Sequence, residues 1–235
     1  MTILTLRTLS ASLAVAAAGI YCASAAAADD VPNNSARIGL YSVFYHSTAD
    51  DLSGPYVPPG VNIDAKIVET VYFGYVRRLS THFLAELALG YPPLTKTVGK
   101  GPATLGSVPY DGQVISTARW LAPTAFVEYI FFSDEAKLRP FIGVGVNYTS
   151  FYDRDSTAQG NAASGGPTRL SLTSSVGPAG TMGLAYNIAN HWNAYASYSA
   201  SQVKTKLRAD TAGVIRTTHI SFGPQALVLS VGYSF

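Results

Sequence analysis

Eight stretches of this chain alternate apolar residues with small or polar ones, and the connections between them are long and short in turn. The predicted strands cover about residues 37–46, 67–76, 83–91, 120–132, 138–152, 170–188, 192–203 and 220–235. Residues 77–82, 133–137 and 189–191 are short connections, whereas the other four are long. A soluble β-sandwich has no reason for this order, but outer-membrane barrels have short periplasmic turns and long external loops. The pattern therefore predicts an all-β, eight-stranded antiparallel transmembrane β-barrel with short periplasmic turns and long extracellular loops.

The composition supports a chain that folds in lipid. The 16 basic and 14 acidic residues together make up 13% of the chain, about half the charged share of a soluble domain. After residue 28, no stretch holds 18 uninterrupted apolar residues, which excludes a helical membrane protein. The near balance of basic and acidic residues also gives no electrostatic reason to expect nucleic acid as a partner.

Residues 1–28 have the layout of a secretory signal peptide. An early cation, Arg7, precedes an apolar run and a tract of small residues that ends at Ala28. We expect cleavage near Ala28, which leaves residues 29–235 as the outer-membrane barrel. The only cysteine, Cys22, belongs to the removed segment. The mature chain is therefore expected to have no disulfide, thiol nucleophile or thiolate metal site.

The two faces of the predicted strands differ in polarity, most clearly from residue 138 onward. Leu138, Pro140, Ile142, Val144, Val146 and Tyr148 alternate with Arg139, Phe141, Gly143, Gly145, Asn147 and Thr149. In lipid every backbone group must be paired within the protein, so a sheet with an apolar outer face is expected to close on itself. The polar face then points into the lumen.

Three charged residues on consecutive strands share that inward face: Glu86, Glu128 and Arg139. We expect a lumen polar cluster in which the guanidinium of Arg139 lies between the two carboxylates and offsets their repulsion. Such a cluster either closes the periplasmic end of the barrel or simply fills its interior.

Four further inward residues are expected above this level, and they define a candidate path for a ligand. They are Phe126, Phe141, Phe151 and Asn147. The aromatic rings would make the lumen apolar and suited to a hydrophobic solute more than to ions. The alternative is that they plug the interior without any ligand.

The last predicted strand ends on alternating apolar residues, among them Tyr233 and Phe235. This pattern is similar to the C-terminal signal by which barrel assembly machinery recognises outer-membrane proteins. Tyr233 and Phe235 are therefore the predicted assembly signal, and the alternative is an ordinary last strand of a β-sandwich.

Two segments carry a family resemblance. The run RWLAPTAFVEYIF at Arg119–Phe131 is similar to the pattern h-L-P-P-T-x-x-x-x-Y-x-F of the outer membrane protein W family. The run RPFIGVGVNYTSF at Arg139–Phe151 resembles that family's R-P-Y-x-G-x-G-x-N-Y-T-x-F more closely. The chain departs from the family at Ala122, where the first Pro is expected, and at Ser234, where Arg is usual.

This resemblance extends over essentially the whole mature chain, and it implies both a location and a function. The implied location is the outer membrane of a Gram-negative bacterium, with outer-membrane lipid as a partner. The implied function is a barrel with a largely apolar lumen that binds small hydrophobic solutes and assists their passage. A structural or adhesive barrel that acts through its loops is the alternative.

The residues that enzymes use for catalysis are sparse. The four histidines form no i, i+4 pair, so we expect no metal site and no cofactor. His219-Ile220-Ser221 resembles the His-x-Ser of outer-membrane lipid A deacylases. A serine nucleophile needs a histidine base and a carboxylate that orients it, and no Asp or Glu follows His219. We therefore expect no catalytic residues, with a lipid A-modifying enzyme as the less favoured alternative.

Overall fold

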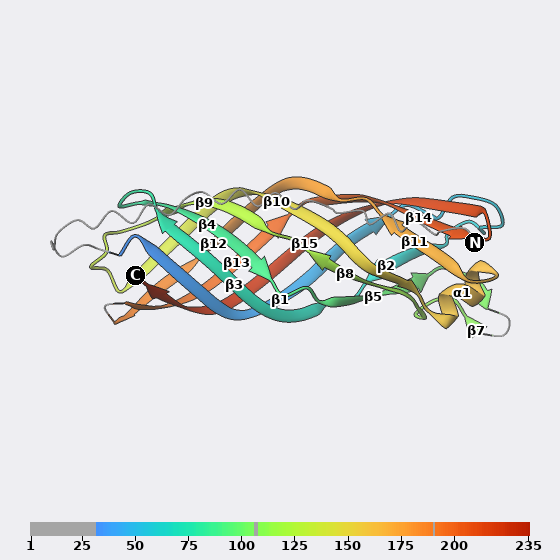
Figure 1. The fold of residues 1–235 in the computed structure, drawn as a ribbon, viewed down its shortest axis with the longest axis horizontal. Helices are drawn as coiled ribbons and strands as arrows, with labels where there is room; N and C mark the ends of the chain where they lie inside the picture. Colours follow the sequence, from blue (N-terminus) through green and yellow to red (C-terminus); the bar gives the residue numbers. More distant parts are fainter. Residues whose placement is uncertain (1–31, 106–107, 190) are drawn as a thin grey trace, which may run out of the picture. The chain divides into compact units, whose positions relative to one another are not determined.

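The computed structural model describes residues 32–105, 108–189 and 191–235, so the predicted signal peptide lies outside the described residues. The described chain forms fifteen strands and one short helix (Figure 1). None of its helical segments has the length and apolar character needed to span a bilayer.

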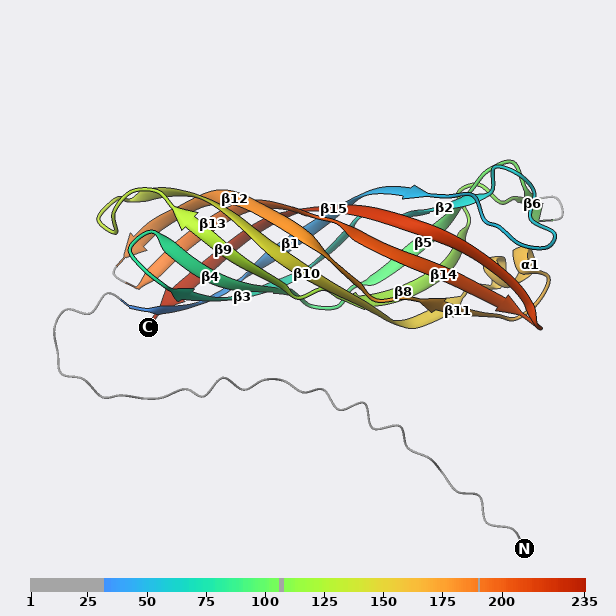
Figure 2. The same ribbon diagram turned by 90° about the horizontal axis from the view of Figure 1, so that it is seen from above.

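Eight strands pair in a closed antiparallel cycle. In their order around the barrel they are β1 (Asn34–Ala49), β3 (Val68–Arg78), β4 (Phe83–Gly90), β9 (Thr124–Ile130), β10 (Leu138–Ser156), β12 (Ser175–Ala189), β13 (Trp192–Ser201) and β15 (Val214–Ser234). The last strand, β15, pairs with both β13 and β1, which closes the barrel. Figures 1 and 2 show these strands winding around a common axis. The predicted eight-stranded barrel is thus confirmed.

Further strands extend the wall at the end opposite the C-terminus (Figure 2). They are β2 (Asn62–Ala65), β5 (Leu94–Lys100), β8 (Val114–Leu121), β11 (Thr168–Leu172) and β14 (Val203–Thr211). The same end carries the helix α1 (Ala158–Ser164) and a small separate sheet of β6 (Thr104–Leu105) and β7 (Val108–Pro109). By the rule that periplasmic turns are short, this is the extracellular end.

Much of the chain expected as long loops is therefore strand. The clearest case is residues 204–219, where β14 and β15 form a hairpin with the two-residue turn Ala212-Gly213. Both turn residues have positive φ, 49° and 89°, as turns that match the twist of a hairpin require. Polar side chains suit these strands because they stand above the lipid, where the outer face meets water.

The wall is interrupted beside β4, where Tyr91, Pro92 and Pro93 separate β4 from β5. Proline has no N–H to donate to a neighbouring strand. Toward β3, Tyr91 N donates to Val71 O at 2.8 Å, and the next described backbone bond is from Lys66 N to Lys96 O at 3.2 Å. Toward β9 and β8, regular pairing stops at Ala88 and resumes at Leu94. We call the segment Tyr91–Pro93 the proline gap.

The outer face is apolar and has an aromatic belt near the short turns. Along β9, buried and exposed residues alternate strictly, as the sequence predicted. Tyr129 contacts Phe83 and Phe131 with ring centroids 5.4 and 5.0 Å apart, and Trp192 contacts Tyr233 at 5.1 Å. Aromatic rings of this kind favour the boundary between lipid and water.

Candidate functional site

A buried ion cluster crosses the lumen on the periplasmic side. Arg37 of β1 donates through Nη1 to Glu86 Oε2 of β4 at 2.7 Å, and the Tyr72 hydroxyl of β3 also bonds to Glu86. Glu128 of β9 faces Glu86 and is only 1% exposed. The Arg37 guanidinium also lies over the ring of Tyr195, 3.6 Å from its centroid. These five residues, which we call the floor cluster, join five strands across the barrel.

The floor cluster uses a different cation from the predicted one. Arg37 pairs with Glu86, whereas Arg139 Nη1 bonds to Asp134 Oδ1 at 2.6 Å in the turn before β10. Arg139 stands four residues nearer that turn than Gly143, the partner of Glu128 in the β9–β10 ladder. Four residues of strand are about 13 Å long. Arg139 therefore faces inward as Glu128 does, but it lies nearer the periplasmic turn. The prediction that Arg139 lies between Glu86 and Glu128 was wrong.

Asp134 holds the second ion group together at the periplasmic turn. Its partial burial alone would raise the pKa of its carboxyl, but hydrogen bonds from Arg78 and the positive charge of Arg139 lower that pKa below its usual value. Arg78 is the last residue of β3, whereas Asp134 lies in the turn between β9 and β10, so the aspartate connects two regions of the barrel wall. This group stabilises the turn, and none of its three residues lines the cavity described next.

A cavity lies on the extracellular side of the floor cluster, and we call it the lumen cavity. Room for water-sized molecules inside it amounts to about 120 Å³, within a wider space of about 1420 Å³ that includes open solvent. One set of lining residues is aromatic or aliphatic: Tyr41, Val43, Tyr45, Trp120, Phe126, Phe151 and Phe222. Another set carries hydroxyl groups: Thr95, Thr97, Ser116, Thr117, Thr149, Thr181, Ser197, Ser199 and Ser201. The lining also includes three charged residues, Asp64, Glu86 and Arg154.

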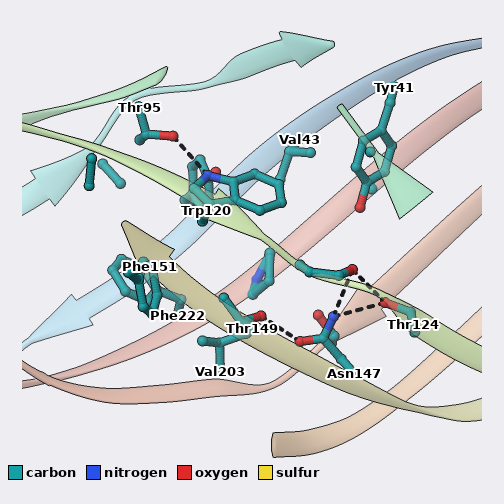
Figure 3. A pocket seen from close by; sticks show the side chains of 18 of the residues that line it. Tyr41, Val43, Thr95, Trp120, Thr124, Asn147, Thr149, Phe151, Val203 and Phe222 are labelled. Carbon is teal, nitrogen blue, oxygen red and sulfur yellow. Dashed lines mark hydrogen bonds between the residues drawn. The ribbon is translucent and has the colours of Figure 1, made fainter. Parts of the chain in front are cut away.

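Several polar groups of this lining are bonded to one another (Figure 3), whereas the buried Tyr45 hydroxyl has no hydrogen-bond partner among the described residues. Trp120 Nε1 donates to Thr95 Oγ1 at 2.8 Å. Asn147 Nδ2 donates to Thr124 Oγ1 at 2.8 Å, and Thr149 Oγ1 donates to Asn147 Oδ1 at 2.7 Å. Because these groups have partners within the wall, an apolar molecule can fill the cavity without leaving them unsatisfied.

Three of the four residues predicted for the ligand path line the lumen cavity: Phe126, Phe151 and Asn147. Phe141 does not, because it packs with Ile130 and Ala185. Phe141 pairs with Ile130. Ile130 is the next inward residue of β9 after Glu128 and lies closer to the periplasmic turn, so the ring of Phe141 fills the barrel beneath the floor cluster. The prediction for Phe141 was wrong for the same reason as that for Arg139: the strand pattern specifies a face but not a height.

Sequence reasoning missed the lining from β1 and β8. Val43, Trp120 and Ala226 form a buried cluster, with Tyr41 and Tyr45 packed against it. The odd positions of β1 from Arg37 to Tyr45 share one face. The charged and aromatic side chains at these positions could have indicated that this face points into the lumen.

The His-x-Ser pair lies outside the lumen, on the outer face of β15. His219 and Ser221 line a groove there, and Asp50, which precedes them in the chain, lines the same groove. A carboxylate that precedes His219 in the chain therefore lies in the same groove, although none follows it. The described residues nevertheless form no hydrogen bond between the His219 ring and Ser221 or Asp50, the contacts that a serine nucleophile requires. No three His, Cys, Asp or Glu residues in the described chain are grouped as metal ligands.

Curated relatives share the sequence over different lengths. Outer membrane protein W of Salmonella typhimurium is 35% identical over 121 residues, 52% of this chain and 56% of that protein, so the chain spans about half the length of this relative. Outer membrane protein W of Vibrio cholerae is 25% identical over 85% of this chain and 87% of its own length. The dibenzothiophene metabolism operon protein PahQ of Pseudomonas aeruginosa is 29% identical over 50% of this chain and 52% of its own.

Solved structures agree on the fold. The outer membrane protein OprG of Pseudomonas aeruginosa superimposes with a TM-score of 0.78 at 19% identity, over 87% of this chain and 96% of that one. The model of the OmpW family matches residues 94–235, more than half of the chain, including β9, β10 and most of the lumen cavity. The chain, an eight-stranded barrel of the outer membrane, therefore belongs to the OmpW family.

Proposed function

We propose that the barrel binds small hydrophobic molecules in the lumen cavity and assists their passage across the outer membrane. The observation that carries this proposal is a cavity lined by aromatic rings, beside which Trp120, Asn147 and Thr149 bond to other groups of the wall. A solute that removes about 200 Å² of apolar surface from water gains about 5 kcal/mol at about 25 cal/mol per Å². The relative named for dibenzothiophene metabolism is consistent with a solute of this kind, because dibenzothiophene is an apolar aromatic compound.

We further propose that the solute leaves the cavity sideways. The floor cluster lies between the cavity and the periplasmic turns, and its buried ion pair makes passage of an apolar molecule unfavourable. The proline gap instead interrupts the wall beside the cavity. Leu89 and Gly90, just before the gap, line the cavity together with Trp120 of β8 and Ala122, which follows β8. A solute that passes here enters the apolar part of the membrane.

Binding can be measured through Trp120, which lines the cavity. Trp192→Phe leaves Trp120 as the only tryptophan, so quenching by a bromoalkane reports occupancy of the cavity. In this background we expect Phe151→Ala to raise the Kd for 1-bromooctane about tenfold. That factor corresponds to about 1.4 kcal/mol of lost contact between ring and alkyl chain.

The matched control is Phe131→Ala, which removes the same ring from the outer face, where Phe131 is exposed. Its Kd should equal that of the parent. Equal quenching by 1-bromooctane in all three proteins, or saturable quenching by a short polar bromide with the same affinity, would contradict a hydrophobic binding site. A barrel that acts only through its loops would give this result.

The sideways exit can be tested by closing the proline gap. The β3–β4 ladder ends with Tyr72 opposite Gly90, and Tyr91 N still bonds to Val71 O. Continued past this bond, the same register would put Thr70, on the inward face of β3, opposite Pro92. Opposed Cα atoms in a regular antiparallel pair are about 4.5–5.5 Å apart, a separation that a disulfide can span. We expect oxidised Thr70→Cys/Pro92→Cys protein to pass an apolar dye into liposomes about tenfold more slowly, equivalent to about 1.4 kcal/mol of barrier.

Adding a reductant to the same sample is the control and should restore the rate. The Pro92→Cys single variant tests whether loss of the proline ring alone changes the rate. If the oxidised and reduced double variants transport equally fast while bromoalkane binding persists, the solute leaves by another route. Binding in the lumen would then stand without the lateral exit.

A further inference from the structure

A row of outward side chains changes character where β13 continues into β14. On β13 the outward residues from Trp192 to Ala200 are apolar or aromatic, whereas on β14 they include Lys204 and Lys206. In a strand tilted by about 40°, the chain from Trp192 to Lys204 rises about 31 Å. The apolar band of an outer-membrane barrel is about 25 Å tall. The two lysines therefore stand at the level of the lipid headgroups in the outer leaflet.

These lysines line a groove on the outer wall, the same groove that contains His219 and Ser221. It encloses about 700 Å³ free of protein atoms, part of it open to solvent. In the ladder, Lys204 is opposite Ser221 and Lys206 is opposite His219. The Cα atoms of two residues two positions apart on a strand are separated by about 6.7 Å. The groove thus presents two ammonium groups, a hydroxyl and an imidazole side by side.

The positive charge of the groove is only partly offset within the described chain. Neither Lys204 nor Lys206 lies within ion-pair distance of a described carboxylate, although nearby Arg208 pairs with Asp210 at 3.3 Å. Asp50 also lines the groove, so two lysines face one carboxylate. Thr173 helps to position the backbone of β14 in the groove, because its hydroxyl accepts a hydrogen bond from Lys206 N at 3.0 Å.

We propose that this groove binds the phosphate of a phosphorylated glycolipid in the outer leaflet, namely lipopolysaccharide. A phosphate monoester offers several acceptor oxygens for the two ammonium groups and the Ser221 hydroxyl, and charge-assisted bonds of this kind are among the strongest in proteins. The acyl chains of the lipid would then lie along the apolar outward row of β13, directly beneath the lysines. The site is on the outer wall, so it is independent of solute binding in the lumen.

The test uses the full-length barrel in detergent and diphosphoryl lipid A as the probe. We expect Lys204→Gln/Lys206→Gln to bind the probe about 30-fold more weakly than wild type, because each cation near an anionic lipid surface contributes about a factor of five. Lys204→Arg/Lys206→Arg should retain binding. Lys100→Gln removes one positive charge, half the change of the double variant, at the same end of the barrel. Because Lys100 is already paired with Asp64 at 3.1 Å, this control should leave affinity unchanged.

Each other outcome overturns the proposal. Equal affinity of wild type and the glutamine double variant, with both proteins folded by heat-dependent electrophoretic mobility, places the lipid elsewhere. Equal weakening in Lys100→Gln indicates a general effect of charge. Displacement of lipid A by inorganic phosphate at comparable concentration identifies a site for free anions instead of a lipid headgroup.

Discussion

Replacing Arg37 by alanine is expected to lower the free energy of unfolding by about 3–5 kcal/mol, the cost of removing one partner from a buried ion pair. The substitution leaves Glu86 and Glu128 facing each other in the closed lumen without the cation that bonds to Glu86 at 2.7 Å. Urea-induced unfolding in lipid, followed by electrophoretic mobility of unheated samples, measures the effect.

Two comparisons separate this cost from simple loss of packing. Arg37→Ala/Glu86→Gln removes one negative charge together with the cation, so it should be less destabilising than Arg37→Ala. Arg139→Ala should also cost less, because Asp134 is partly exposed to water and remains bonded to Arg78. If Arg37→Ala and Arg139→Ala cost the same, the floor cluster does not depend on Arg37.

Introducing a charge at Val144 should destabilise the barrel by about 2–4 kcal/mol, the range for Lys at the midplane of the membrane. Val144 is 72% exposed on the outer face, and its neighbours Ile142 and Val146 on the same face are also apolar. The lysine of Val144→Lys would therefore have to place its ammonium in hydrocarbon or distort the bilayer. The free energy of unfolding in liposomes measures this cost.

Ser199→Lys is the matched control on a nearby part of the wall. Val144 pairs with Gly180, and Gly180 pairs with Ala200, the residue next to Ser199. Ser199 points inward and lines the lumen cavity, where an ammonium can reach water. Its substitution should therefore cost clearly less than Val144→Lys. Equal penalties at the two sites would be incompatible with the inward and outward faces described above.

The sequence by itself determined the class of fold. Because side chains alternate across a strand and lipid accepts only apolar ones, the pattern from Leu138 to Thr149 specifies which side chains face outward. The same reasoning placed Glu86, Glu128, Phe126 and Asn147 inside the barrel, where the structure has them. These inferences succeed because each depends only on neighbours within one strand and on the solvent that the strand meets.

Only the tertiary structure decided which inward residues meet. The partner of Glu86 is Arg37, more than 40 residues away in the chain, and not Arg139. Phe141 lies beneath the floor cluster, and Asp50 reaches the groove of His219. Heights within a barrel depend on how far each strand is shifted against the next, and that shift is set by closing all eight strands together. A periodicity of two residues carries no information about this shift, so contacts between strands cannot be read from it.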